Sequence, residues 1–87
     1  MFIILVYDFD SKRVGKALKK CRQYLNWVQN SVFEGEITAA NLMKLKFELS
    51  LIMDEEYDSI IIYQFRTLAY STREVIGVEK NTLSNFL

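Results

Sequence analysis

The chain opens with an unbroken run of apolar residues, Phe2 to Tyr7, which ends at Asp8. A run without alternation is typical of a central strand covered by helices on one face and by a partner on the other. It is too short to span a bilayer, and it lacks the basic residues and the cleavage site of a signal peptide. We therefore expect a buried strand in a cytoplasmic protein that does not enter a membrane.

Two later segments have the apolar spacing of amphipathic helices. The apolar positions of the first helix, which Asp10 or Ser11 can cap, are Val14, Ala17, Leu18, Cys21 and Leu25. The second helix is expected to follow Thr38 as its cap, with an apolar face of Leu42, Leu45, Leu49 and Ile52. The polar residues 54–58 that come next predict a solvated loop.

The remaining segments have the composition of strands. Residues 27–36 are rich in β-branched and aromatic side chains, but Gln29-Asn30-Ser31 in their middle favours a kink or a turn. The segment is therefore either one bent strand or two short ones. Residues 60–65 predict a buried strand, and residues 72–78 predict a last short strand before a polar tail.

This order of elements predicts an α+β fold. A β-α-β-β-α-β chain, with 27–36 counted as two strands, packs most economically as a ferredoxin-like antiparallel sheet with two helices on one face. A chain of 87 residues builds one modest core, so we expect residues 1–87 to form a single domain. Six Phe, five Tyr and one Trp exceed what so small a core can hide, which favours a homodimer.

The charges are balanced overall but unevenly placed. Eleven Lys and Arg match eleven Asp and Glu, so the formal charge is zero and gives no general reason to expect a nucleic acid or a membrane as partner. The first helix segment is the exception, because its basic residues are Lys12, Arg13, Lys16, Lys19, Lys20 and Arg22. They form either a solvated helix surface or, doubled in a dimer, a stripe that binds phosphates without base specificity.

Few residues of the chain are suited to catalysis. There is no histidine, and the one cysteine, Cys21, lies on the expected apolar helix face, which indicates a core residue. Asp8 remains: it either complements the N-terminal end of the helix dipole or ligates a metal. Mg²⁺ usually takes one or two carboxylates together with water and a phosphate. Two copies of Asp8 across a two-fold axis, with a bound phosphodiester, would therefore complete a magnesium site.

Two motifs at a defined spacing resemble a known family. They are Tyr7-Asp8 at the end of the first strand and, about twenty residues later, Gln29-Asn30-Ser31-Val32-Phe33-Glu34-Gly35. The basic helix between them opens with Lys12-Arg13-Val14. Together these motifs resemble the small CRISPR-associated adaptation protein of the Cas-two family, and the resemblance runs from residue 2 to about residue 79.

The resemblance implies a ferredoxin-like homodimer in which a C-terminal strand, about residues 72–78, is exchanged, so that residues 72–87 pack on the partner subunit. It also implies a site for Mg²⁺ or Mn²⁺ at the paired Asp8 carboxylates. Members of the family have been described as metal-dependent nucleases on RNA or double-stranded DNA, and as the central dimer that joins two dimers of the Cas-one integrase. The implied role is CRISPR adaptation, with duplex DNA and single-stranded RNA as the nucleic acids bound.

The resemblance also assigns roles to single residues. Asp8 is the metal ligand, Tyr7 is its catalytic neighbour, and Ser31 and Phe33 belong to the motif beside the site. Nucleic acid would be bound by Arg13, a phosphate contact, and by Lys12, Lys16 and Lys19. Trp27 departs from the pattern, because some relatives carry an arginine at that position.

Two other hypotheses remain open at this point. A toxin-type endoribonuclease of the virulence-associated protein D kind is similar in fold and size, and it would also use Asp8. A ferredoxin-like domain that senses small molecules would bind its ligand through glycine-containing loops, whereas this chain has only Gly15, Gly35 and Gly77. The tail, residues 78–87, forms either an interaction strand or a frayed terminus.

Overall fold

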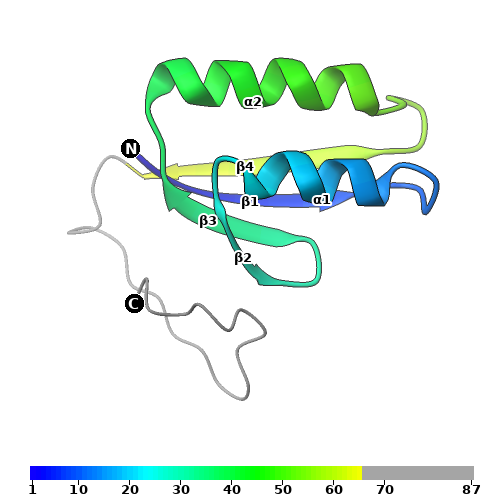
Figure 1. The fold of residues 1–87 in the computed structure, drawn as a ribbon, viewed down its shortest axis with the longest axis horizontal. Helices are drawn as coiled ribbons and strands as arrows, with labels where there is room; N and C mark the ends of the chain where they lie inside the picture. Colours follow the sequence, from blue (N-terminus) through cyan, green and yellow to red (C-terminus); the bar gives the residue numbers. More distant parts are fainter. Residues whose placement is uncertain (66–87) are drawn as a thin grey trace.

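Residues 1–65 are the part of the chain that the computed structural model describes, and they contain two helices and four strands (Figure 1). In chain order these are β1 (Phe2–Asp8), α1 (Val14–Arg22), β2 (Asn26–Gln29), β3 (Val32–Glu36), α2 (Ala39–Ile52) and β4 (Ser59–Phe65). The β-α-β-β-α-β order confirms the predicted α+β fold. The strand expected at 72–78, with its exchange between subunits, lies outside the described residues.

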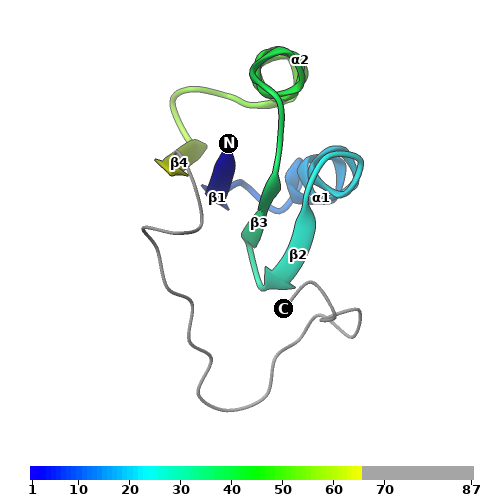
Figure 2. The same cartoon turned by 90° about the vertical axis from the view of Figure 1, so that its left-hand side faces the viewer.

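The four strands form one antiparallel sheet in the order β2-β3-β1-β4. β1 is central, and its pairing with β4 runs from Phe2 opposite Phe65 to Asp8 opposite Ser59. Both helices lie on the same side of the sheet (Figure 2). No helix of residues 1–65 lies on the other side, so the two faces of the sheet have different surroundings.

The core lies between the sheet and the helices. Alternate residues of a strand point to the same face, and β1 accordingly buries Ile3, Leu5 and Tyr7. The helices cover them with Ala17, Cys21, Leu42, Leu45 and Leu49, which confirms both predicted apolar helix faces. α1 ends at Arg22, so Leu25 lies beyond the helix, yet its side chain is buried in the same core.

Residues 26–36, for which the sequence allowed one bent strand or two short ones, form a β-hairpin. β2 and β3 are joined at Asn30-Ser31, and Asn30 has a φ of 45°, a left-handed conformation that Asn adopts more readily than most residues. The indole N–H of Trp27 donates to the carbonyl of Asn30 at 2.8 Å. The backbone N–H of Tyr7 donates to the carbonyl of Ser31 at 3.1 Å, which ties the turn to the end of β1.

The predicted N-cap residue is confirmed for α2 and was wrong for α1. The hydroxyl of Thr38 accepts a hydrogen bond from the backbone N–H of Asn41 at 3.1 Å, so the predicted cap of α2 is confirmed. The N-cap of α1 is Arg13, without a side-chain cap, and the prediction of Asp10 or Ser11 was wrong. The carboxylate of Asp10 instead accepts from the backbone N–H of Lys12 in the preceding turn.

Neither α1 nor α2 has the length and apolar character needed to cross a membrane.

Candidate functional site

Three connections meet at the end of the sheet where β1 stops (Figure 1). They are the β1–α1 loop (9–13), the β2–β3 turn (30–31) and the α2–β4 loop (53–58). Asp8, the last residue of β1, pairs here with Ser59, the first residue of β4. The two motifs of the sequence analysis, far apart along the chain, therefore converge at one end of the fold.

Asp8 is exposed, and its side chain lies on the sheet face away from the helices. Tyr7, the residue before it, is buried under the helices, and successive side chains of a strand point to opposite faces. Pairing with Ser59 holds the backbone of Asp8 in the sheet. A carboxylate in this place can therefore reach solvent or a partner from a rigid support.

The sheet face that carries Asp8 is apolar along the β1–β4 pair, whereas on β3 it carries Glu34 and Glu36 as well as Val32. We call the apolar β1–β4 part of this surface the open face. Its residues are Phe2, Ile4, Val6, Ile61, Tyr63 and Phe65. The rings of Phe2 and Phe65 lie with their centroids 6.2 Å apart, and half of Ile61 (50%) and Tyr63 (53%) remains exposed. Residues 60–65 form the predicted strand, but the prediction that it is buried was wrong within residues 1–65. Ile60 and Ile62 on the helix side are only partly buried, and Gln64 on that side is exposed.

Tyr7 and Phe33 support the strand that carries Asp8 from the opposite face. Tyr7 is 4% exposed and Phe33 is fully buried, and their rings stack with centroids 6.1 Å apart. Burial raises the pKa of the Tyr7 phenol, Cys21 raises it further, and a hydrogen bond with Ser31 opposes these effects. Within one chain, the structure does not bring the side chains of Tyr7 and Phe33 to the face that carries Asp8.

Three of the basic side chains near α1 are engaged within the fold. Arg13 pairs with Asp58 at 2.6 Å, Lys20 with Glu48 at 3.7 Å, and the guanidinium of Arg22 lies 5.9 Å from the centroid of the Trp27 ring. The last contact is within the range of a cation–π interaction. It places a cation next to Trp27, the position at which some relatives carry arginine.

The other three basic side chains, Lys12, Lys16 and Lys19, are exposed. No ion pair of these side chains is found within residues 1–65. Lys16 and Lys19 lie one turn apart on α1, where residues three apart in sequence are neighbours on the surface. The cations with neither an ion pair nor a ring contact within residues 1–65 are therefore these three lysines, while Arg22 is exposed beside Trp27.

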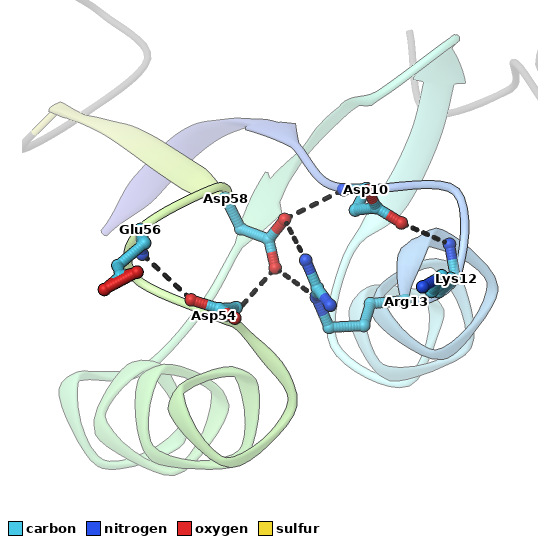
Figure 3. Close-up of polar contacts among 6 residues, drawn as sticks. All are labelled: Asp10, Lys12, Arg13, Asp54, Glu56 and Asp58. Atoms are coloured by element: carbon cyan, nitrogen blue, oxygen red, sulfur yellow. Dashed lines mark hydrogen bonds and ion pairs between the residues drawn. The ribbon is translucent and has the colours of Figure 1, made fainter.

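Asp58 is a residue that the sequence analysis missed, because the polar loop 54–58 was expected to be solvated. Its side chain is fully buried, and both of its oxygens are used (Figure 3). Oδ1 accepts from the backbone N–H of Asp10 at 2.8 Å and from Nη2 of Arg13 at 3.1 Å. Oδ2 accepts from the backbone N–H of Asp54 at 2.8 Å and from Nε of Arg13 at 2.6 Å. We call these four hydrogen bonds the Asp58 clasp.

The clasp keeps Asp58 charged. The hydrogen bond from Arg13 holds the pKa of the Asp58 carboxyl well below its usual range, against the opposing effect of burial, and the backbone N–H groups of Asp54 and Asp10 lower it further. Arg13 in turn has its pKa raised by Asp58. An acid two residues before the β-branched run Ile60 to Ile62 was the only sequence signal available, and it does not distinguish a buried carboxylate from a loop acid.

The donor set for a metal ion is incomplete in a single chain. Within residues 1–65, no three acidic or cysteine side chains lie close enough together to hold a metal ion. Asp8 offers one exposed carboxylate on the open face. Carboxylate oxygen is the protein ligand that Mg²⁺ and Mn²⁺ prefer. The residues therefore fit such an ion if a second copy of the chain supplies a second carboxylate.

Comparisons with known proteins agree on one family. The model of the family described as CRISPR associated protein Cas2, which is the Cas-two family of the sequence analysis, matches residues 1–73. A CRISPR-associated endoribonuclease Cas2 from Dictyoglomus turgidum is 48% identical over 87 residues, which cover 100% of both chains. A protein of the same name from Pyrococcus furiosus is 47% identical over 87 residues, again 100% of both chains.

Solved structures give the same result. A crystal structure of a Cas2 protein is 41% identical in sequence, with a TM-score of 0.83 over 92% of this chain and 90% of the other. Cas2 from Streptococcus pyogenes is 33% identical, with a TM-score of 0.76 over 88% of this chain and 100% of the other. These similarities favour the first hypothesis over the toxin-type nuclease and the small-molecule sensor.

Proposed function

Because this chain belongs to the Cas2 family, we propose that it acts in CRISPR adaptation as a nucleic-acid-binding homodimer with metal-dependent phosphodiesterase activity on RNA or duplex DNA. The observation that carries this proposal is the exposed carboxylate of Asp8 at the end of the open face. The relatives from Dictyoglomus turgidum and Pyrococcus furiosus are named endoribonucleases, which supports a nuclease of this kind.

A homodimer formed through the open face would complete the site. An exposed apolar surface of this kind favours association, and a two-fold interface uses the same surface on both subunits. Since Asp8 lies at one end of the open face, a two-fold axis near that end would bring both Asp8 carboxylates together. Residues 72–87 would then pack on the partner subunit, as the family resemblance implies.

In this dimer each side chain has a distinct task. The two Asp8 carboxylates would hold Mg²⁺ or Mn²⁺, which when bound polarises a phosphodiester and lowers the pKa of a water ligand. Lys12, Lys16 and Lys19 attract the phosphate backbone and fix its position without reading bases. Tyr7 and Phe33 keep the end of β1 rigid from the helix side.

The same dimer would serve as a scaffold in adaptation. Two copies of the exposed lysines on α1 provide a surface for duplex DNA, and two C-terminal tails, residues 78–87, would provide contacts for the two dimers of the Cas-one integrase. Cleavage needs Asp8 in addition to the lysines, whereas the scaffold does not, so DNA binding stays measurable when Asp8 is replaced.

The test compares the purified protein with Asp8→Ala on labelled single-stranded RNA and duplex DNA, with Mg²⁺, with Mn²⁺ and with EDTA. We expect metal-dependent cleavage that falls about 100-fold or more in Asp8→Ala, because a ligand of the metal is lost. Glu55→Ala, which removes an exposed acid of the α2–β4 loop, is the matched control and should cleave like the wild type. Equal cleavage by wild type and Asp8→Ala would refute the assignment of Asp8.

A further inference from the structure

The Asp58 clasp closes the end of the β1–β4 pair next to Asp8. Asp58 directly precedes Ser59, which is the residue opposite Asp8 in the sheet. Its carboxylate accepts from the backbone of Asp10, two residues beyond Asp8. The clasp therefore joins the chain that leaves β1 to the chain that enters β4, at the point where strand pairing ends. Movement of either loop would move the backbone that carries Asp8.

The clasp also ties Asp8 to the start of α1. The carbonyl of Asp10 accepts from the backbone N–H of Arg13 at 2.8 Å and of Val14 at 3.0 Å, and the side chain of Arg13 returns to Asp58. The β1–α1 loop is thus fixed by hydrogen bonds at both of its ends. Figure 3 shows the guanidinium of Arg13 and the backbone of Asp10 converging on the Asp58 carboxylate from one side, and Asp54 approaching it from the other.

Two donors of Arg13 are used by the fold, and its side chain is only 23% exposed. A guanidinium has five N–H donors in a fixed fork, and here Nε and Nη2 both point at the buried carboxylate of Asp58. A phosphate that drew Arg13 away would leave the Asp58 charge buried without its partner, which is strongly unfavourable. Lys12, the next residue along the chain, carries an exposed ammonium and has no such constraint.

We propose that Arg13 and Asp58 are positioning residues that hold the Asp8 carboxylate in place for cleavage, and that Arg13 is not a phosphate contact. This inference rests on the proposed function, because Asp8 is the metal ligand there. It replaces the role that family resemblance assigns to Arg13, and it adds a residue, Asp58, to those on which activity depends.

The first test is a kinetic comparison of Asp58→Asn, Arg13→Ala and Arg13→Lys at a temperature where each variant is folded. We expect all three to lower kcat by about 10- to 100-fold with KM for RNA within about twofold of wild type, because misplacement of a catalytic group by about 1 Å costs up to about 100-fold. Arg13→Lys should not rescue Arg13→Ala, since lysine cannot make the two-pronged contact with Asp58. The proposal would be overturned if Asp58→Asn left kcat unchanged while Arg13→Ala raised KM and Arg13→Lys returned KM to the wild-type value.

Two control variants calibrate this comparison. Lys12→Ala removes a neighbouring exposed cation and should raise KM while kcat stays near wild type, which is the signature of a phosphate contact. Glu55→Gln removes an exposed acid from the same loop as Asp58 and should leave both parameters unchanged.

A second measurement does not depend on cleavage. The double variant Arg13→Ala/Asp58→Asn keeps the net charge of the protein, so its duplex DNA binding can be compared with wild type over a range of salt concentrations. We expect the same dependence of log K on log salt, whereas each lost phosphate contact would reduce the slope by about 0.9. A reduced slope would overturn the inference. If the wild type cleaves neither substrate, the proposed activity fails, but the salt dependence of DNA binding still decides the role of Arg13. If the double variant does not fold, the kinetic comparison of Asp58→Asn with the wild type decides the proposal.

Discussion

At the scale of single residues, burial decides what each acid at the site end of the sheet does. Asp8 and Asp58 lie at the same end of the β1–β4 pair, yet Asp8 is exposed on the open face while Asp58 is buried and accepts four hydrogen bonds. A buried carboxylate with all its acceptor sites used serves the fold. An exposed one remains available to a metal ion or a partner.

The depressed pKa of Asp58 predicts how stability depends on pH. The folded pKa lies below the unfolded value of about 3.9, so the contribution of Asp58 to the free energy of unfolding is full above that value and is lost as pH falls through the folded pKa. Asp58→Asn should therefore lower Tm at pH 7, and its deficit relative to wild type should shrink progressively below about pH 4. Thermal unfolding followed by circular dichroism between pH 2 and 7 measures this difference. Glu55→Gln, at an exposed site of the same loop, should show no such pH-dependent deficit, and a constant deficit for Asp58→Asn would contradict the prediction.

At the scale of elements, α1 divides its charges between the fold and the surface. The helix carries basic residues in its last turn and no acidic residue in its first. Lys20 pairs with Glu48, and Arg22 is exposed but lies against the Trp27 ring. Lys16 and Lys19 are therefore the exposed cations of this helix that make neither an ion pair nor a ring contact within residues 1–65. The number of basic residues in the sequence thus overstates the charge that α1 offers to a nucleic acid.

Charge reversal on α1 should weaken DNA binding and flatten its salt dependence. In a dimer, Lys16→Glu/Lys19→Glu would remove up to about four phosphate contacts, each worth about 0.9 in the slope of log K against log salt. The control is Lys44→Glu/Lys46→Glu, which makes the same change on the exposed surface of α2. Fluorescence anisotropy of labelled duplex DNA over a series of salt concentrations measures both variants. Equal effects of the two pairs would show that net charge, and not the α1 surface, governs binding.

At the scale of the whole molecule, the sheet has one face that the helices cover and one that they leave open, which is apolar along β1 and β4. The helices bury Ile3, Leu5 and Tyr7, whereas Ile61 and Tyr63 on the open face stay half exposed. α2 also exposes apolar side chains, Met43, Phe47 and Leu51, but on the side away from the core. The open face is the one that ends at Asp8, so the proposed dimer would use it.

A charge on the open face should therefore separate the subunits. Ile61→Asp replaces an apolar side chain that the dimer would bury, and we expect the dimer to dissociate about 100-fold or more readily, since burial of one such side chain contributes roughly 1.5–3 kcal/mol. Leu51→Asp changes an even more exposed apolar side chain on α2 and should leave the dimer intact. Sedimentation velocity over a range of protein concentrations compares the two. A monomeric Leu51→Asp and a dimeric Ile61→Asp would place the interface on α2.

Much of the fold could be predicted because local patterns and long-range packing agree. The apolar spacing of 42–49 and the cap at Thr38 define α2, and the apolar run 2–7 defines the central strand. The hairpin at 26–36 could not be decided in the same way, because its polar middle is compatible with a kink. Pairing with β1 and the left-handed conformation of Asn30 decide it in the structure.

The sequence by itself determined the order of elements, the apolar helix faces and the burial of Cys21, because each follows from residue types at short spacing. Only the tertiary structure decided which charged side chains are available to a metal ion or a phosphate. It placed Tyr7 and Asp8 on opposite faces of the sheet and joined Arg13 to Asp58, 45 residues apart. Contacts over such separations depend on how the loops at one end of the sheet meet, and no local pattern of residues carries that information.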